Sequence, residues 1–345
     1  MNHCGLDVAT KSSYVYLTDE KGSKLTNGEV MTEREALRKR LTPYLRGGLR
    51  VAVEAGNQTA WIHDLLVEMG AEVIVVNPAK VKLIAESRKK TDKIDAKILC
   101  ELLRLDALPH PVHMPGKDAR EVRGLLVARR QLVTARTKLV NTVRGLVRQE
   151  GITLASRELL SLVGWDRLLG RQFRSAHLPT VIRSFAESVK TLTTSIRELE
   201  KELAQREKKD ERAARLQTMP GVGRIGSMTL LGAVDRIERF PSARKLVGYS
   251  GLAPTVRASG ERVEYGSISR EGRSELRGVW VQIAHLVAQD RSPEARPLRS
   301  WYLKTAKRRG IKTAMVALAR KLLVIAYHML TKGKDYDPKL LGKTG

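Results

Sequence analysis

Residues 3–18 read HCGLDVATKSSYVYLT, and residues 49–54 read LRVAVE. Their apolar and β-branched side chains predict strands over residues 3–9, 12–18 and 49–53. The segment GSKLTN at 22–27 predicts a further strand, and residues 20–22 form the turn that precedes it. The first third of the chain therefore begins with three strands joined by short turns.

Helices and strands alternate over the residues that follow. Apolar spacing predicts helices at 33–42, 61–69, 79–87 and 92–105, and a further strand at 72–76. Three hairpin-connected strands followed by alternating helices and strands favour an α/β sheet of the ribonuclease H type. Other mixed α/β folds stay open as alternatives.

The composition indicates a large and strongly basic protein. The chain has 345 residues, 63 Lys and Arg against 37 Asp and Glu, and a net charge of +26. Its 42% of hydrophobic residues suffices for a core, which excludes a disordered chain. The length suggests two or three domains. Such an excess of base points to a polyanionic partner, most of all nucleic acid.

Cellular location is inferred from what the composition lacks. Two cysteines, Cys4 and Cys100, are too few for a disulfide framework or a zinc cluster, so a reducing cytoplasm is expected. No apolar stretch approaches the ~18–20 residues of a membrane span, and the first ten residues lack the apolar core of a signal peptide. We therefore expect a cytoplasmic protein without a membrane partner.

The positive charge is unevenly distributed. Residues 1–110 contain 17 basic and 15 acidic side chains, so nearly all of the excess lies in residues 111–345. We expect this later part to contact phosphates. The candidate basic contacts are Arg224, Arg257, Arg262, Arg270, Lys307, Arg308 and Arg309.

The middle of the chain predicts two long helices after a proline-broken linker at 108–116. They cover about 119–149 and 180–215, and the second has apolar residues spaced alternately by three and four. That spacing is typical of a coiled coil, which pairs either two helices of one chain or two chains. We predict domains at 1–108, 109–214 and 215–332, with a tail at 333–345. The apolar residues are Ile182, Phe185, Val189, Leu192, Ile196, Leu199 and Leu203.

The last third begins with the turn MPGVGR at 219–224, between two predicted helices. This arrangement is typical of a helix-hairpin-helix, in which Gly221 and Gly223 let backbone N–H groups approach a phosphate. A loop or hairpin is expected at 252–272, followed by helices at 275–289 and 311–331. A basic cluster that includes Lys307 lies between these two helices.

Four carboxylates are the candidate chemical groups of the first third. Asp7 lies within an apolar strand, Glu54 ends another, and Asp92 and Asp95 lie three residues apart at a helix start. A carboxylate in a strand is costly unless it is paired or binds a cation. In a ribonuclease H-type sheet all four acids converge, and two Mg²⁺ or Mn²⁺ ions about 4 Å apart would relieve their repulsion. The alternatives are an N-cap or first-turn role for Asp92, a lysine partner for Asp7, and an exposed strand end for Glu54.

Several blocks of the sequence resemble the DEDD transposases of bacterial insertion sequences, which are kin to a site-specific DNA invertase. In the first third they are GLDVA at 5–9, VEAG at 53–56, VNP at 76–78 and KTDKIDA at 90–96. In the last third they are PGVG at 220–223, YSGLAP at 249–254, SG at 259–260 and GSISREG at 266–272. The blocks occur in the family's order over nearly the whole chain.

The resemblance implies a RuvC-like N-terminal domain, a coiled-coil linker and a mostly helical C-terminal transposase domain. It implies Mg²⁺-dependent recombination of donor and target DNA, with a structured noncoding RNA of the element as the guide. It also implies a homo-oligomer, a dimer that pairs into a tetramer. By its place among the motifs, the family's nucleophilic serine corresponds to Ser259, with Ser267 and Ser269 as competitors. Without the resemblance, Ser259 reads as an ordinary turn residue.

Two other functions compete with an RNA-guided recombinase. A structure-selective, Mg²⁺-dependent junction nuclease would use the four acids and water, and it leaves the C-terminal motifs unexplained. A nucleic-acid-binding scaffold without catalysis leaves the four acids unexplained. A recombinase that uses Ser259 must bring that residue to acids at the other end of the chain.

Overall fold

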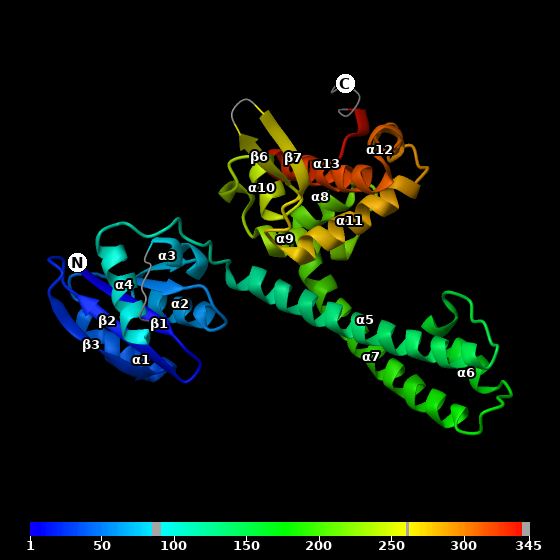
Figure 1. Ribbon diagram of the computed structural model, residues 1–345, viewed down its shortest axis with the longest axis horizontal. Coiled ribbons are helices and arrows are strands. Elements are labelled where there is room, and N and C mark those ends of the chain that lie inside the picture. Colours follow the sequence, from blue (N-terminus) through cyan, green and yellow to red (C-terminus); the bar gives the residue numbers. More distant parts are fainter. Residues whose placement is uncertain (85–90, 260–261, 340–345) are drawn as a thin grey trace. The chain divides into compact units, whose positions relative to one another are not determined.

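A computed structural model describes residues 1–84, 91–259 and 262–339, and it omits the side chains of 256–259 and 262–265. The chain divides into two compact units, Met1–Pro115 and Gly116–Gly345 (Figure 1). The first unit is a mixed α/β structure, and the second is mostly helical.

A five-stranded sheet forms the centre of the first unit. Its strand order is β3-β2-β1-β4-β5. β1 pairs antiparallel with β2 and parallel with β4, so the sheet is mixed. β3 continues the antiparallel side and β5 the parallel side. The bounds are β1 Asn2–Val8, β2 Ser12–Thr18, β3 Lys24–Met31, β4 Leu49–Glu54 and β5 Glu72–Val76.

Helices cover both faces of this sheet (Figure 1). Leu37 of α1 and Leu65 of α2 belong to the core on one face, together with Leu6 of β1. Val81 of α3 and Leu99 of α4 belong to the core on the other face. The helices are α1 Arg34–Leu41, α2 Thr59–Glu68, α3 Pro78–Ile84 and α4 Asp92–Arg104, with a 3-10 turn at Thr42–Tyr44.

Gly5 permits an unusually close approach of α4 to the sheet. A Cβ atom built at Gly5 would lie 1.9 Å from the carbonyl oxygen of Ala96 and 2.6 Å from the amide nitrogen of Cys100. Both of these are backbone atoms of α4, which leaves no flexible side chain to move aside. Glycine is therefore required in the middle of β1 by packing, although it is a poor strand residue.

The second unit begins with a helical hairpin made of α5 (Lys117–Gln149) and α7 (Leu178–Lys208). The 3-10 turn Glu158–Leu160 and α6 (Leu162–Leu169) lie between them, at the tip (Figure 1). Arg129 on α5 donates to Glu200 on α7 at 2.7 Å, and Arg206 pairs with Glu121 at 2.8 Å. The regular apolar positions of α7 thus pack within one chain, and four of them are buried: Ile182, Val189, Ile196 and Leu203.

The remaining helices of the second unit surround the buried Trp280. They are α8 Glu211–Gln217, α9 Arg224–Val234, α10 Ala243–Tyr249, α11 Ser274–Gln289, α12 Arg296–Arg309 and α13 Ile311–Lys332, with a 3-10 turn at Ile237–Arg239. A hairpin of β6 (Pro254–Ser259) and β7 (Arg262–Ile268) connects α10 to α11. Among the described residues only α13 is long and apolar enough to cross a membrane, and half of its apolar window is buried.

The structure corrects two sequence predictions in the second unit. The second long helix ends at Lys208 rather than near 215, because Asp210 caps a separate helix, α8, by accepting from the Arg212 amide. The basic cluster around Lys307 does lie between α11 and α13, but it forms the end of a further helix, α12, where no helix was predicted. The C-terminal part of the predicted helix at 79–87 and the end of the tail lie outside the described residues.

We predict that Gly5→Ala destabilises the first unit by about 1–3 kcal/mol or more, because the added methyl group meets the α4 backbone. The measurement is the midpoint of urea unfolding of the full chain. Gly56→Ala is the control, since its Cβ would stand 3.7 Å from Thr59 Oγ1, an ordinary contact. Equal stability of the two variants would contradict the close packing of α4 on β1.

Candidate catalytic site and nucleic-acid interface

Asp7 and Glu54 lie on neighbouring strands at the same end of the sheet. Gly5 is paired with Ala52, and Leu6 with Val53, in the parallel register of β1 and β4. Ala52 belongs to the core on the α4 side of the sheet. Side chains two residues apart on a strand share a face, so Asp7 and Glu54 both lie on the α4 side, on strands about 4.8 Å apart.

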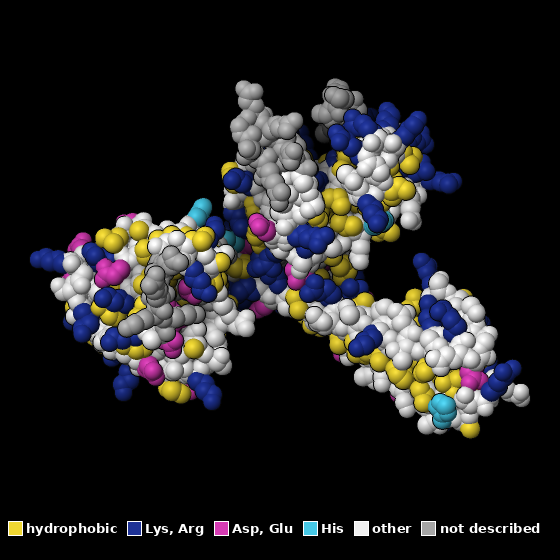
Figure 2. Space-filling model, in the orientation of Figure 1, with side chains coloured by type: hydrophobic (Ala, Val, Ile, Leu, Met, Phe, Trp, Pro, Cys, Tyr) yellow, Lys and Arg dark blue, Asp and Glu magenta, His cyan; other side chains and the backbone are white. Residues whose placement is uncertain are grey.

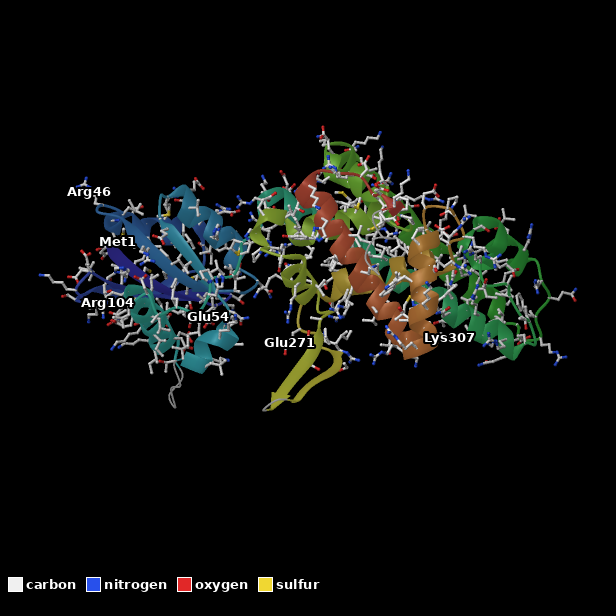
Figure 3. All side chains as sticks on the ribbon, turned by 90° about the horizontal axis from the view of Figure 1, so that it is seen from above. Met1, Arg46, Glu54, Arg104, Glu271 and Lys307 are labelled. Carbon is white, nitrogen blue, oxygen red and sulfur yellow. The ribbon has the colours of Figure 1, made fainter. Side chains whose placement is uncertain are left out.

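The direction of α4 brings Asp92 and Asp95 to this same end. Cys100 Sγ donates to the carbonyl oxygen of His3 at 3.2 Å, whereas Ala96, one turn earlier, packs on Gly5. α4 therefore runs antiparallel to β1, and its first turn lies toward Asp7. Figure 3 agrees, because Arg104 at the end of α4 lies near Met1 and away from Glu54.

The start of α4 is fixed by Thr91. The Thr91 hydroxyl accepts a hydrogen bond from the Ile94 amide at 3.3 Å, as an N-cap residue does. Asp92 is exposed and Asp95 is half-buried. Thr91 takes the capping role that was the alternative explanation for Asp92. The positive end of the helix dipole favours both carboxylates at this position.

The acid side chains do not form a ready-made metal cluster. Across residues 1–84, 91–259 and 262–339, no group of three or more His, Cys, Asp or Glu is arranged to hold one metal ion. The backbone nevertheless gathers the four acids at one end of the sheet. Carboxylate oxygens are nevertheless the donors that Mg²⁺ and Mn²⁺ prefer.

Ser259 is the last residue of β6, where it is paired with Arg262 across the hairpin. Arg257 lies on the same strand, opposite Glu264. The side chains of Ser259, Arg257 and Arg262 lie outside what the structure describes. Of the competing serines, Ser267 is exposed on β7. Ser269 follows β7, is half-buried, and donates its amide to the Ala253 carbonyl at 2.8 Å.

The turn at 218–223 joins α8 to α9, as a helix-hairpin-helix requires. Gly221 has a φ of +75°, and its Cβ would meet Val287 at 2.9 Å, so this glycine is needed for backbone conformation and packing. Gly223 precedes α9 and faces open space, which leaves its backbone accessible. Arg224 forms an ion pair with Glu207, which partly neutralises its charge toward a phosphate.

Four of the predicted basic contacts lie on well-exposed surface. Arg270 is exposed and has a positive φ of 57°. Lys307, Arg308 and Arg309 are exposed in the last turn of α12, where Figure 2 shows Lys and Arg side chains gathered. Figure 3 places Lys307 toward that end of the helix. Cations at a helix C-terminus are also favoured by the helix dipole.

An arginine cluster around Tyr249 was not predicted from the sequence. Arg123 donates to the carbonyl oxygen of Ala233 at 3.0 Å, and Arg273 donates to the Tyr249 hydroxyl at 2.7 Å. Arg239 stacks over the Tyr249 ring, 4.6 Å from its centroid. Burial, and then the charges of Arg273 and Arg239, lower the pKa of Arg123 to about 10, against the opposing effect of Tyr249. These residues are far apart in sequence, so no local motif could reveal the cluster.

Comparison with known proteins assigns both units to one family. A family of DEDD transposases of the IS110 type matches residues 4–151, and the "Transposase IS116/IS110/IS902 family" matches residues 213–299. A putative transposase of Sinorhizobium fredii is 31% identical over 83% of this chain and 74% of its own length. The chain belongs to the IS110 family of transposases.

Two further relatives of the transposase bear on its activity. The transposase of insertion sequence IS1111A from Coxiella burnetii is 27% identical, over 85% of this chain and 80% of its own. The pilin gene-inverting protein of Moraxella bovis is 28% identical, over 78% and 76%. A transposase of this family is a DNA-processing enzyme, and the resemblance seen in the sequence blocks is confirmed. The first family match includes all four acids, and the second includes Ser259.

We expect Mg²⁺ to raise the thermal unfolding midpoint of the transposase by about 2–4 °C, because a ligand that binds only the folded state stabilises it. Asp7→Asn should lower this increase, since it replaces one carboxylate donor by a neutral amide. Glu35→Gln, at an exposed acid of α1, is the matched control. An identical Mg²⁺ response in wild type and Asp7→Asn would contradict a role of Asp7 in metal binding.

Proposed function

We propose that this transposase cuts and rejoins DNA strands with a serine nucleophile and two divalent metal ions. Asp7, Glu54, Asp92 and Asp95 would hold Mg²⁺ or Mn²⁺, and Ser259 would attack the phosphate. The observation that carries the proposal is the placement of two strand-end acids beside the first turn of α4. The strand order β3-β2-β1-β4-β5 supports a RuvC-like, ribonuclease H-type fold for residues 1–108.

The proposed step is an in-line displacement at phosphorus. The Ser259 hydroxyl loses its proton as its oxygen bonds to the phosphorus, and the bond from phosphorus to the 3′ oxygen breaks. The products are a 5′-phosphoserine linkage and a free 3′-hydroxyl, and the reverse reaction with a new 3′-hydroxyl rejoins strands without ATP. Bound metal ions would lower the pKa of the attacking hydroxyl and stabilise charge on the phosphate.

The remaining parts of the proposal concern partners. The resemblance implies a structured noncoding RNA as guide for donor and target DNA, and the charge excess of residues 111–345 supports binding of such polyanions. We assign residues 109–214 to a linker and residues 215–332 to the C-terminal transposase domain. The family pattern further implies dimers that pair into tetramers. Leu192 and Leu199 of α7, which are half-buried, remain available for contacts of that kind.

Ser259→Ala should retain binding to nucleic acid but form no covalent adduct and no recombinant, because it removes only the attacking hydroxyl. The measurement is mass-spectrometric peptide mapping of the protein trapped on a nicked suicide DNA substrate. Ser267→Ala, at an exposed serine on the partner strand, is the control and should form the adduct normally.

Other results of this mapping would replace the proposal. An adduct on Ser267 or Ser269 would move the nucleophile to that residue. Full DNA cleavage by Ser259→Ala, with no adduct at any residue, would favour direct attack by water and the junction-nuclease mechanism.

A further inference from the structure

A groove between α5, α9 and α11 lies outside both the acid site and the basic contacts described above. It encloses a volume of about 440 Å³, within the range of ~300–1,000 Å³ typical of ligand pockets. All three helices belong to the second unit. Its apolar wall includes Leu126, Ile225, Leu276 and Val279.

The charged side chains of this groove are mostly arginines. Four arginines and one acid line it: Arg123, Arg129, Arg130, Arg273 and Glu275. Glu275 pairs with Arg130 at 3.2 Å, and Arg129 pairs with Glu200 across the hairpin at 2.6 Å. Glu275 and Glu200 therefore neutralise the charges of Arg130 and Arg129, which are adjacent residues of α5.

Arg123 and Arg273 have neutral hydrogen-bond partners. Arg123 donates to two backbone carbonyls at the end of α9, and Arg273 donates to the Tyr249 hydroxyl. Carbonyl and hydroxyl groups satisfy the N–H donors without cancelling the positive charge. The groove thus combines an apolar wall with two fixed guanidinium groups, a combination complementary to a flat aromatic ring that bears an anion.

We propose that this groove binds one unpaired nucleotide of a bound nucleic-acid strand, with its base against the apolar wall and its phosphate toward Arg123 and Arg273. Unstacked bases are commonly held by aromatic rings or guanidinium planes, and bases extruded into pockets also by apolar side chains. The phosphate supplies the anion. A base in an intact duplex is stacked on both faces and has no free face to offer. The inference rests on the nucleic-acid function proposed above, but it does not involve Ser259 or the four acids.

Gly278 offers a direct way to fill the groove. It lies on α11 and lines the groove, and a Cβ at this position would meet no atom within 4 Å. Gly278→Leu therefore occupies the groove while leaving every arginine in place, and leucine is also the better helix former. Gly145→Leu is the matched control, because Gly145 lies on α5 away from the groove and its Cβ likewise meets open space.

The experiment measures binding of fluorescein-labelled 20-mers to the full chain by anisotropy. The probes are single-stranded RNA, single-stranded DNA of the same sequence, and the corresponding DNA duplex. We expect Gly278→Leu to weaken single-strand binding about tenfold, the scale of losing roughly 50–60 Å² of buried apolar contact. Duplex binding by Gly278→Leu, and all binding by Gly145→Leu, should stay within about twofold of wild type. Loss with RNA alone would identify a guide-type strand, and equal loss with RNA and DNA would identify a site that ignores the sugar.

Two results would overturn the inference. One is unchanged single-strand binding by a folded Gly278→Leu, and the other is an equal loss with the duplex. If Gly278→Leu fails to fold, photocrosslinking of wild type to a strand containing 4-thiouracil decides instead. Adducts within residues 123–134, 225–233 or 273–282, which line the groove, support it, and adducts only elsewhere overturn it. Covalent adduct formation at Ser259 is scored separately, so failure of the groove and failure of the proposed catalysis are distinguishable.

Discussion

The contact between α4 and Gly5 sets the geometry of the first unit. The helix backbone lies so close to β1 that no side chain fits between them. Such a contact fixes both the height of α4 above the sheet and its position along β1. The first turn of α4 is thereby held beside the ends of β1 and β4. This contact places Asp92 and Asp95 at the end of the sheet where the parallel register of β1 and β4 already places Asp7 and Glu54.

Electrostatics explains why charged side chains are tolerated at this end of the sheet. Carboxylates at strand ends and at a helix start remain partly in water, so their charge costs less than it would in the core. The helix dipole favours two of them, and Thr91 provides the cap that an aspartate would otherwise supply.

The second unit handles its charge differently. In the α5–α7 hairpin, the arginines that interrupt the apolar seam find partners on the opposite helix, as Arg129 does with Glu200. Around α9 the arginines bond instead to backbone carbonyls and to Tyr249. The first arrangement neutralises charge and the second preserves it. Positive charge is therefore retained at the groove between α5, α9 and α11, whereas ion pairs neutralise it along the hairpin.

The sequence by itself determined the elements of the first unit and the identity of its acids. These elements follow from local patterns, which a single sequence is enough to reveal. They are the alternation in β1 and β2, the apolar run of β4 and the acid-rich start of α4. The family was likewise readable, because its motifs are short and ordered. The extent of α12 was missed, since its many charged residues obscure the apolar face that packs Leu298 and Tyr302.

Only the tertiary structure decided which residues far apart in the sequence meet. The seam of α7 could have paired with another chain, and the fold directs its buried positions to α5 because that helix offers a complementary apolar and charged face. The groove lined by Arg123 and Arg273 has no signature in the sequence, because helices 150 residues apart supply these side chains. The packing of α5 against α11 and α9 brings these arginines together, and no periodicity of the sequence predicts that packing.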